Sequence, residues 1–177
     1  GRSACDIVLT DVIVAADRAI GPIGAAAAII DEALDVATAA LSAEAVGIMR
    51  RLTLDTLEYT RNRRQGGKAL ADHQVVQHRI VDMAVLTEQG SALAQAAALK
   101  LGGSALERAM AVSAAKAFIS KAVKTVGQSA VQLHGGMGMT DEIAIGNLFR
   151  RGTMIERQLG SADYHLDRWE SASASPD

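Results

Sequence analysis

Residues 132–151 read QLHGGMGMTDEIAIGNLFRR, and this stretch decides how the rest of the chain is interpreted. Glycines at 135, 136 and 138 suggest a backbone that approaches a phosphate. The pattern is not G-x-G-x-x-G, however, because Met139, Thr140 and Asp141 follow. The cluster also comes after a helical pattern, where a dinucleotide-binding turn needs a strand. The residues alone therefore favour a corner between two helices, at which glycine supplies a positive φ.

Helical patterns lie on both sides of this corner. Apolar residues at spacings of three and four predict a first helix over 25–63, with Ile30, Leu34, Ala37, Leu41, Ala45, Ile48 and Leu52 on its inner face. Further helices are predicted over 73–100, 104–133, 141–156 and 161–170. Asp72 is the expected N-cap of the second, and Ser104 with Glu107 forms a capping box for the third. Three long helices with short connections and no strand–helix alternation predict an all-α, antiparallel four-helix bundle.

The N-terminal residues differ from the rest. CDIVLTDVIV (5–14) is β-branched and alternating, which predicts a short strand, although a lone strand is not stable. We therefore divide the chain into a strand and linker at 1–22, the bundle at 23–170, and a disordered polar tail at 171–177. Because the chain starts without Met and directly with this pattern, we expect a fragment or a processed product of a longer protein.

Composition and charge argue against several classes of partner and site. The 177 residues carry a net charge of −2 and no basic or aromatic-basic stripe, which argues against nucleic acid as a partner. The single Cys5 excludes an intramolecular disulfide and a Cys-rich metal site. No apolar run reaches the roughly 20 residues that a membrane span needs, and no signal peptide is evident. We expect a soluble, cytoplasmic protein.

Individual side chains give weaker signals. The histidines at 73, 78, 134 and 165 have no metal-ligand spacing, so surface or supporting roles are expected and no metal site is assigned. Arg61, Arg63 and Arg64 end the first helix. They either complement its dipole or bind a phosphate, and the residues alone leave both open.

Two stretches together resemble a known family. RNRRQGGKALADHQVVQHRIVDM (61–83) resembles the acyl-CoA dehydrogenase corner that contains Arg, Phe-Gly and Gln, and residues 132–151 resemble the second signature of that family, Q-x-x-G-G-x-G. The opening strand resembles the end of the family's β-domain. The resemblance covers nearly the whole chain, but only the C-terminal part of a full dehydrogenase. LHGGMGMTDE and GSADYHL are most similar to small-subunit-type members such as the pimeloyl-CoA dehydrogenase small subunit.

The resemblance implies an FAD-dependent oxidoreductase of fatty acid metabolism that dehydrogenates an acyl-CoA thioester between Cα and Cβ. It implies a tetramer, a dimer of dimers, in which these corners contact the FAD of a neighbouring subunit. Carried over by position, Arg63 pairs with the pyrophosphate and Gln65 lies beside it. The remaining cofactor-binding positions are Gln132, Gly135 and Gly136 along the ADP portion, and Ser161 after the expected base.

The chain departs from the family at the catalytic base. The family's glutamate stands 27 residues after the signature glutamine, which is Leu159 when counted from Gln132. Some members place the base on the first long helix, which corresponds to Ala37. Neither side chain accepts a proton, so no catalytic residue is assigned. A second departure is Gly66, which replaces the family's Phe and removes an aromatic surface.

Three explanations follow. A partner subunit carries the base, which we favour; another carboxylate serves, with Asp35 and Glu156 nearest in sequence; or the chain is a non-catalytic relative. The contrasting class is a helical domain for oligomerisation or partner binding. The corners at Arg63 and Gln132 discriminate between the enzyme and this non-enzymatic domain, because the enzyme hypothesis requires the two corners to meet around a cleft that fits ADP.

Overall fold

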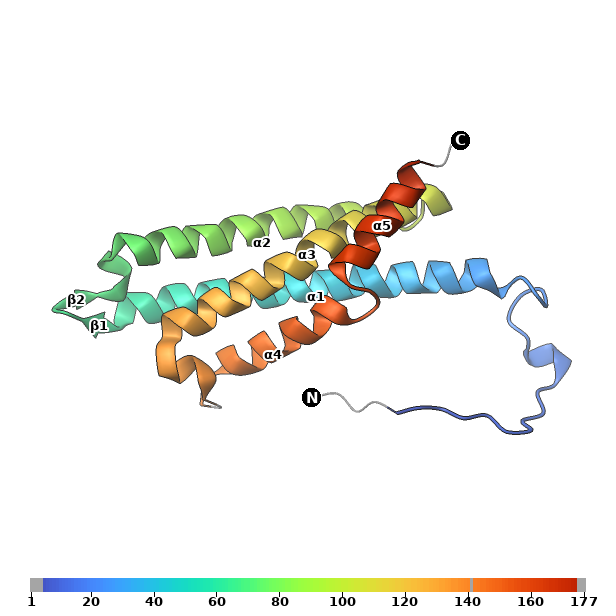
Figure 1. The fold of residues 1–177 in the computed structure, drawn as a ribbon, viewed down its shortest axis with the longest axis horizontal. Coiled ribbons are helices and arrows are strands. Elements are labelled where there is room, and N and C mark those ends of the chain that lie inside the picture. Colours follow the sequence, from blue (N-terminus) through green and yellow to red (C-terminus); the bar gives the residue numbers. More distant parts are fainter. Residues whose placement is uncertain (1–4, 141, 175–177) are drawn as a thin grey trace.

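The computed structural model describes residues 5–140 and 142–174, and over these residues the chain is a helical bundle (Figure 1). Three long helices lie side by side, namely α1 (Ala26–Asn62), α2 (Gln74–Lys100) and α3 (Ala105–His134). Two shorter helices, α4 (Ala144–Arg157) and α5 (Ala162–Ser173), pack against α3. The short elements are η1 (Ala16–Arg18), β1 (Arg64–Gln65), β2 (Lys68–Ala69), η2 (Leu70–Asp72) and η3 (Gly135–Met139). The predicted all-α fold is confirmed.

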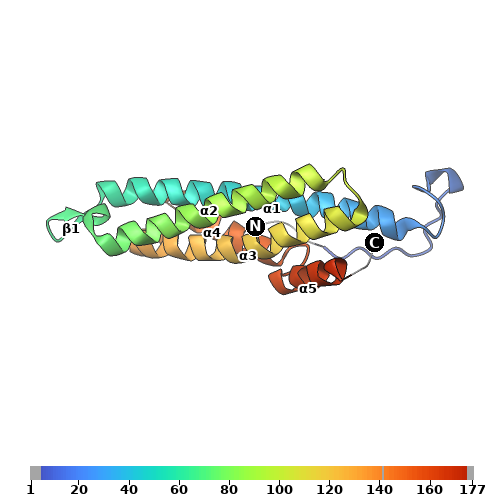
Figure 2. The same cartoon turned by 90° about the horizontal axis from the view of Figure 1, so that it is seen from above.

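The central helix is α3, which contacts all four other helices. Its buried side chains include Val112, Ala115, Ile119 and Val126, none of which is exposed to solvent. Small alanines at the helix contacts allow the backbones to approach closely. In Figures 1 and 2, α4 runs beside α1 and α3, and α5 crosses α3 at the end where α3 begins.

The apolar stripe of α1 is only partly buried. Leu41, Ala45 and Leu52 are buried as predicted, whereas Ile30 and Leu34 are 55% and 45% exposed. The first turns of α1 extend past the ends of α2 and α3 (Figure 2) and therefore pack against neither of these helices. Periodicity identified most of the buried face, although Ala37, which was predicted on it, is exposed. It could not show where the neighbouring helices end.

The strand predicted over residues 5–14 is wrong for this structure. These residues have no strand hydrogen bonds, and Ile7 and Ile13 are 78% and 97% exposed. The physical reason is that a strand needs a partner, and residues 5–25 form a wide loop that lies apart from the helices (Figure 1). At the other end, α5 continues to Ser173, so the first residues of the expected disordered tail are helical. Residues 175–177 lie outside the described range.

Helix ends agree with only some of the local signals. Ser104 and Glu107 form the predicted capping box of α3. Asp72 is not the N-cap of α2, because His73 holds that position and the Asp72 carboxylate accepts a hydrogen bond from the Ala69 amide instead. The fourth helix begins at Ala144 rather than 141.

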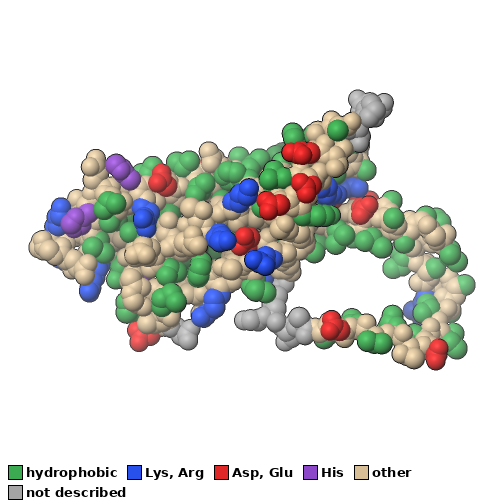
Figure 3. Space-filling model, in the orientation of Figure 1, with side chains coloured by type: hydrophobic (Ala, Val, Ile, Leu, Met, Phe, Trp, Pro, Cys, Tyr) green, Lys and Arg blue, Asp and Glu red, His purple; other side chains and the backbone are tan. Residues whose placement is uncertain are grey.

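Two further observations concern the distribution of charge on the surface and the length and apolar character of the helices. Acidic and basic side chains are interspersed where α4 and α5 cover α3 (Figure 3). Among the helices of residues 5–140 and 142–174, none combines the length and the apolar character that a membrane crossing requires.

Candidate functional site

The glycine cluster forms a corner at the end of α3. Gly135 follows the last helical residue with φ 61° and donates its amide to the Gln132 carbonyl. A Cβ at Gly135 or Gly136 would face open space, so their backbone is accessible. Gly138 is required for a different reason, because a Cβ there would lie 2.8 Å from the Val131 carbonyl oxygen. The predicted helix corner with a positive φ is confirmed.

The arginine corner follows α1. Strands β1 and β2 pair Arg64 with Ala69 and Gln65 with Lys68. The two residues between them, Gly66 and Gly67, both have positive φ, at 61° and 84°. A two-residue hairpin turn of this kind needs positive φ at both positions, which glycine provides without strain. The glycine found where the family has Phe is therefore the residue that tightens this turn.

The two corners meet in one groove of about 640 Å³, which we call the corner groove. It is lined by Tyr59, Arg63, Gln65, Leu70, Val76, Gln132, Leu133, His134, Gly135, Gly136 and Met137. Five of the six cofactor-binding positions carried over from the family thus come together, although 69 residues separate Arg63 from Gln132. The side chain of Arg63 is exposed at this groove.

Tyr59 and His134 connect the two corners and were missed by the sequence reasoning. Their rings stack with centroids 4.3 Å apart, and the Tyr59 hydroxyl lies 3.4 Å from the His134 carbonyl oxygen, which accepts a hydrogen bond. Of the surface or supporting roles expected for the histidines, His134 has the supporting one, since it is buried and its Nδ1 lies 2.9 Å from the Ala130 carbonyl oxygen. One signal was available: Tyr59 precedes Arg63 by four residues and so shares its helix face.

The electrostatics of the corner groove suit an anion. The first turn of α2 contributes Val76 to the lining, so the positive end of the α2 dipole points to this region. The ends of α1 and α3 contribute partial negative charge, and the Arg63 guanidinium adds a full positive charge to the same groove. Arg63 can form paired hydrogen bonds to a phosphate, and the open glycine backbone admits close approach.

Ser161 is not part of this groove. It is the N-cap of α5, and its hydroxyl accepts a hydrogen bond from the Tyr164 amide at 3.2 Å. Helix α5 lies toward the opposite end of the bundle from the hairpin (Figure 1), so the structure does not bring Ser161 to Arg63 within one chain.

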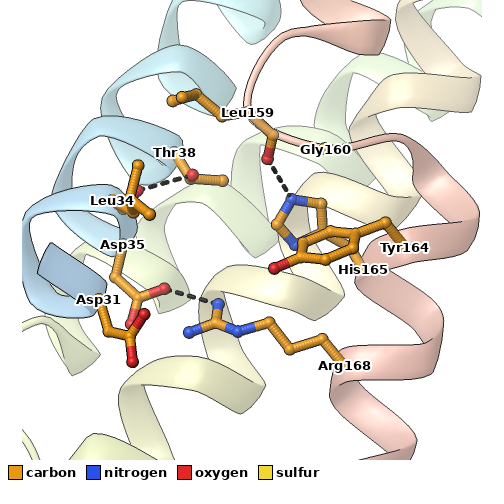
Figure 4. A pocket seen from close by; sticks show the side chains of 9 residues that line it. All are labelled: Asp31, Leu34, Asp35, Thr38, Leu159, Gly160, Tyr164, His165 and Arg168. Atoms are coloured by element: carbon orange, nitrogen blue, oxygen red, sulfur yellow. Dashed lines mark hydrogen bonds and ion pairs between the residues drawn. The ribbon is translucent and has the colours of Figure 1, made fainter. Parts of the chain in front are cut away.

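A second pocket of about 290 Å³, the α5 pocket, lies between α1 and α5 (Figure 4). It is lined by Asp31, Leu34, Asp35, Thr38, Leu159, Gly160, Tyr164, His165 and Arg168. Leu159, at the expected base position, is part of this lining and has an unusual φ of 59°. Ala37, the alternative base position, is exposed on α1 and is not part of the lining. The pocket therefore presents a hydrocarbon where a proton acceptor was expected.

The two other carboxylates considered as bases are engaged elsewhere. Asp35 is 2% exposed, and its two oxygens lie 2.6 Å from Arg168 Nη1 and 3.3 Å from Arg108 Nε. The hydrogen bond to Asp35 is the main cause of the raised pKa of Arg168. Both oxygens of Asp35 are therefore already engaged by guanidinium groups. Glu156 pairs with Lys124 at 3.5 Å and does not line the pocket.

His165 is buried beneath this pocket. Its Nε2 lies 2.9 Å from the Leu159 carbonyl oxygen and its Nδ1 lies 3.3 Å from Ser113 Oγ. A carbonyl only accepts, so Nε2 carries the proton. Burial is the largest cause that lowers the pKa of His165, so the ring is neutral near pH 7. No cluster of three or more metal-ligating side chains occurs within residues 5–140 and 142–174.

Comparison with known proteins identifies the family. The family model described as "Acyl-CoA dehydrogenase, C-terminal domain" matches residues 19–171, and the chain belongs to this family. An L-prolyl-[peptidyl-carrier protein] dehydrogenase from Serratia sp. is 35% identical over 141 residues, which is 79% of this chain and 36% of that protein.

Two solved structures show the same fold. The first is titled "FAD complex of PigA" and matches with a TM-score of 0.78 at 30% sequence identity. The match covers 86% of this chain and 39% of the PigA chain. The second is the Tcur3481–Tcur3483 steroid ACAD, which matches with a TM-score of 0.78 at 29% sequence identity. The match covers 84% of this chain and 41% of the chain in that structure. The chain thus spans about two-fifths of the length of these relatives.

Proposed function

We propose that this chain is the C-terminal domain of an FAD-dependent acyl-CoA dehydrogenase subunit that helps to bind flavin and lacks its own catalytic base. The observation that carries the proposal is the corner groove, in which Arg63, Gln65, Gln132, Gly135 and Gly136 gather from two distant segments. A helical domain that served only as a scaffold would have no need to place an exposed arginine beside an open glycine backbone.

The corner groove fits the diphosphate of FAD. Arg63 would pair with the pyrophosphate, and the open backbone at Gly135 and Gly136 would accept the ADP portion without a side chain in the way. The Tyr59–His134 stack holds the arginine and glycine corners together, so it would keep these groups in register. When bound, the flavin supplies the hydride acceptor of the reaction.

The α5 pocket supports a division of labour between subunits. Leu159 cannot take the α-proton of a thioester, and the Asp35 carboxylate is held by two arginines. A partner subunit would therefore supply the glutamate. The name of the similar Tcur3481–Tcur3483 steroid ACAD pairs two designations, which agrees with an assembly of unlike subunits in that protein. We extend the proposal to a dimer of dimers, to an acyl-CoA substrate from fatty acid metabolism and to a cytoplasmic location.

A second candidate is a non-catalytic domain for oligomerisation or partner binding. The observation that favours it is the same Leu159, together with an α5 pocket lined by the Asp35–Arg168 ion pair rather than by hydrocarbon alone. The two candidates differ in flavin binding, which a scaffold would not require.

The test uses the full-length subunit, produced alone and together with its partner subunit. We expect a flavin absorbance spectrum from the assembled protein, and acyl-CoA oxidation only when the partner is present. Arg63→Ala should weaken FAD binding by about tenfold or more, which corresponds to the loss of charged hydrogen bonds worth about 1.5–3 kcal/mol. Arg61→Ala, on the same helix turn but outside the groove, is the matched control.

Two results would contradict the proposal. Turnover of acyl-CoA by the subunit alone would show that a base exists within it. An assembled protein without flavin, in which Arg63→Ala and Arg61→Ala behave alike, would favour the scaffold candidate.

A further inference from the structure

The connection between α4 and α5 has a backbone conformation that side chains rarely adopt. Leu159 and Gly160 follow one another with φ of 59° and 104°, both in the left-handed region. A Cβ at Gly160 would lie 2.5 Å from Tyr164 Cδ1 and 2.9 Å from His165 Nε2. The corner is therefore packed directly against α5, and a strained residue such as Leu159 persists only where its surroundings hold it.

Lys116 holds this corner from α3. Its side chain is fully buried, and Nζ lies 3.0 Å from the Ile155 carbonyl, 3.2 Å from the Glu156 carbonyl and 2.9 Å from the Gly160 carbonyl. The first two carbonyls belong to the last turn of α4, where no intrahelical donor is available. An ammonium group at this end also complements the α4 dipole. Lys116 thus connects the end of α4 to the corner that follows it.

His165 holds the neighbouring carbonyl from α5. Its Nε2–H donates to the Leu159 oxygen at 2.9 Å, while Ser113 Oγ lies 3.3 Å from Nδ1 and also 3.3 Å from Arg168 Nη1. The imidazole orientation is therefore fixed by a chain of contacts that leads to the Arg168–Asp35 ion pair. Two consecutive carbonyls, at 159 and 160, are held by two helices that pack against each other.

We propose that Lys116 and His165 are positioning residues that hold the Leu159–Gly160 corner and so direct side chain 159 into the α5 pocket. His165 fixes the peptide unit that follows Leu159. Lys116 holds the last carbonyls of α4, and the Gln158 amide donates to the Met154 carbonyl, so the backbone that precedes Leu159 is fixed as well. The Cα–Cβ direction of Leu159 is therefore restricted from both sides. The functional meaning of this position rests on the proposed function, in which the α5 pocket corresponds to the site of the base. The positioning itself depends only on the residues described above.

The test needs neither flavin nor substrate. In the 177-residue chain with Cys5→Ser, Lys116→Cys is alkylated in urea with 2-bromoethylamine or with iodoacetamide and then refolded. The first reagent rebuilds a side chain of nearly lysine length that ends in an amine, and the second leaves a neutral amide. Lys121→Cys, exposed on the same helix, is treated identically as the control. Hydrogen exchange is then measured by mass spectrometry for peptides over 158–164 and over 112–123.

The neutral adduct at position 116 should reduce protection of the 158–164 peptide by about tenfold or more and leave the 112–123 peptide unchanged. The amine adduct should restore it, and the adducts at position 121 should have no effect. Equal loss of protection in both peptides would show a general structural role and overturn the proposal. Unchanged protection at 158–164 would overturn it as well.

A second variant keeps the test decisive if the adducts at 116 do not refold. His165→Phe removes the donor to the Leu159 carbonyl and retains an aromatic ring. Loss of protection confined to 158–164 would support the proposal, and no change there would refute it. Failure of the full-length protein to bind flavin would contradict the proposed function and leave these exchange results intact, so the two failures are distinguishable.

Discussion

The buried position of Lys116 leads to a prediction about how the free energy of unfolding depends on pH. Burial of the ammonium group lowers the pKa of Lys116 from 10.5 to about 8, and the Glu156 carboxylate acts in the opposite direction. In the unfolded chain this amine titrates near its ordinary pKa of about 10.4. Between pH 8 and 10.4 the unfolded chain therefore binds more protons than the folded chain. The contribution of this group to the free energy of unfolding consequently rises with pH and is lost as the pH falls through 8.

The size of the effect follows from the two pKa values. A folded pKa of about 8 and an unfolded pKa of about 10.4 give a gain of about 2 kcal/mol between pH 8 and pH 10. Lys116→Met removes the titrating group, so the difference in free energy of unfolding between the wild type and this variant should increase by that amount. Other lysines and tyrosines titrate in both proteins and cancel in the difference.

The assay is urea unfolding followed by circular dichroism at pH 8 and pH 10. Lys121→Met is the control, since Lys121 is exposed on the same helix and should give a curve parallel to that of the wild type. A difference between wild type and Lys116→Met that stays constant from pH 8 to pH 10 would refute the reasoning, because the buried amine would then have an ordinary pKa.

Three further predictions concern the ion pairs of Asp35, the glycine corner at the end of α3 and the Leu159–Gly160 corner. Asp35→Asn should lower the free energy of unfolding by about 3–5 kcal/mol in urea titrations, because it leaves the buried Arg108 and the half-buried Arg168 without their carboxylate. Glu44→Gln, at a more exposed pair, should cost about 1 kcal/mol or less. Gly138→Ala should cost about 1–3 kcal/mol in thermal unfolding through its clash with the α3 backbone, while Gly102→Ala, which meets no atom within 4 Å, should be close to neutral. Leu159→Glu in the full-length subunit without its partner should raise acyl-CoA-dependent bleaching of flavin by about 100-fold over background, with Leu159→Gln as the inactive control.

Local signals in the sequence account for the parts of the fold that were predicted correctly. The capping box at Ser104 and Glu107 and the positive φ at Gly135 depend on residues within one helical turn. The long helices follow from apolar periodicity. The meeting of Arg63 and Gln132 came from the resemblance to a family, because their separation in sequence carries no information about distance in space.

Contacts between distant helices account for what was missed. Lys116 was not singled out from the sequence, although it stands at helical spacing with Val112 and Ile119 on the buried face of α3. Periodicity could place it inside, but only the fold shows that the end of α4 supplies its acceptors. The failed strand over 5–14 has the same origin, since β-propensity describes residues that suit a sheet and cannot supply the neighbouring strand.

At the corner between α4 and α5, backbone geometry and side-chain chemistry are set by different residues. The left-handed φ of Leu159 costs about 1–2 kcal/mol for a residue with a Cβ. Lys116, His165 and the close packing at Gly160 offset this cost, and none of them is the residue at 159. A change of side chain at 159 therefore changes what the α5 pocket can do without changing how the corner is held. Under the proposed function, this separation explains how the chain could lack the base and still keep the corner that would present it.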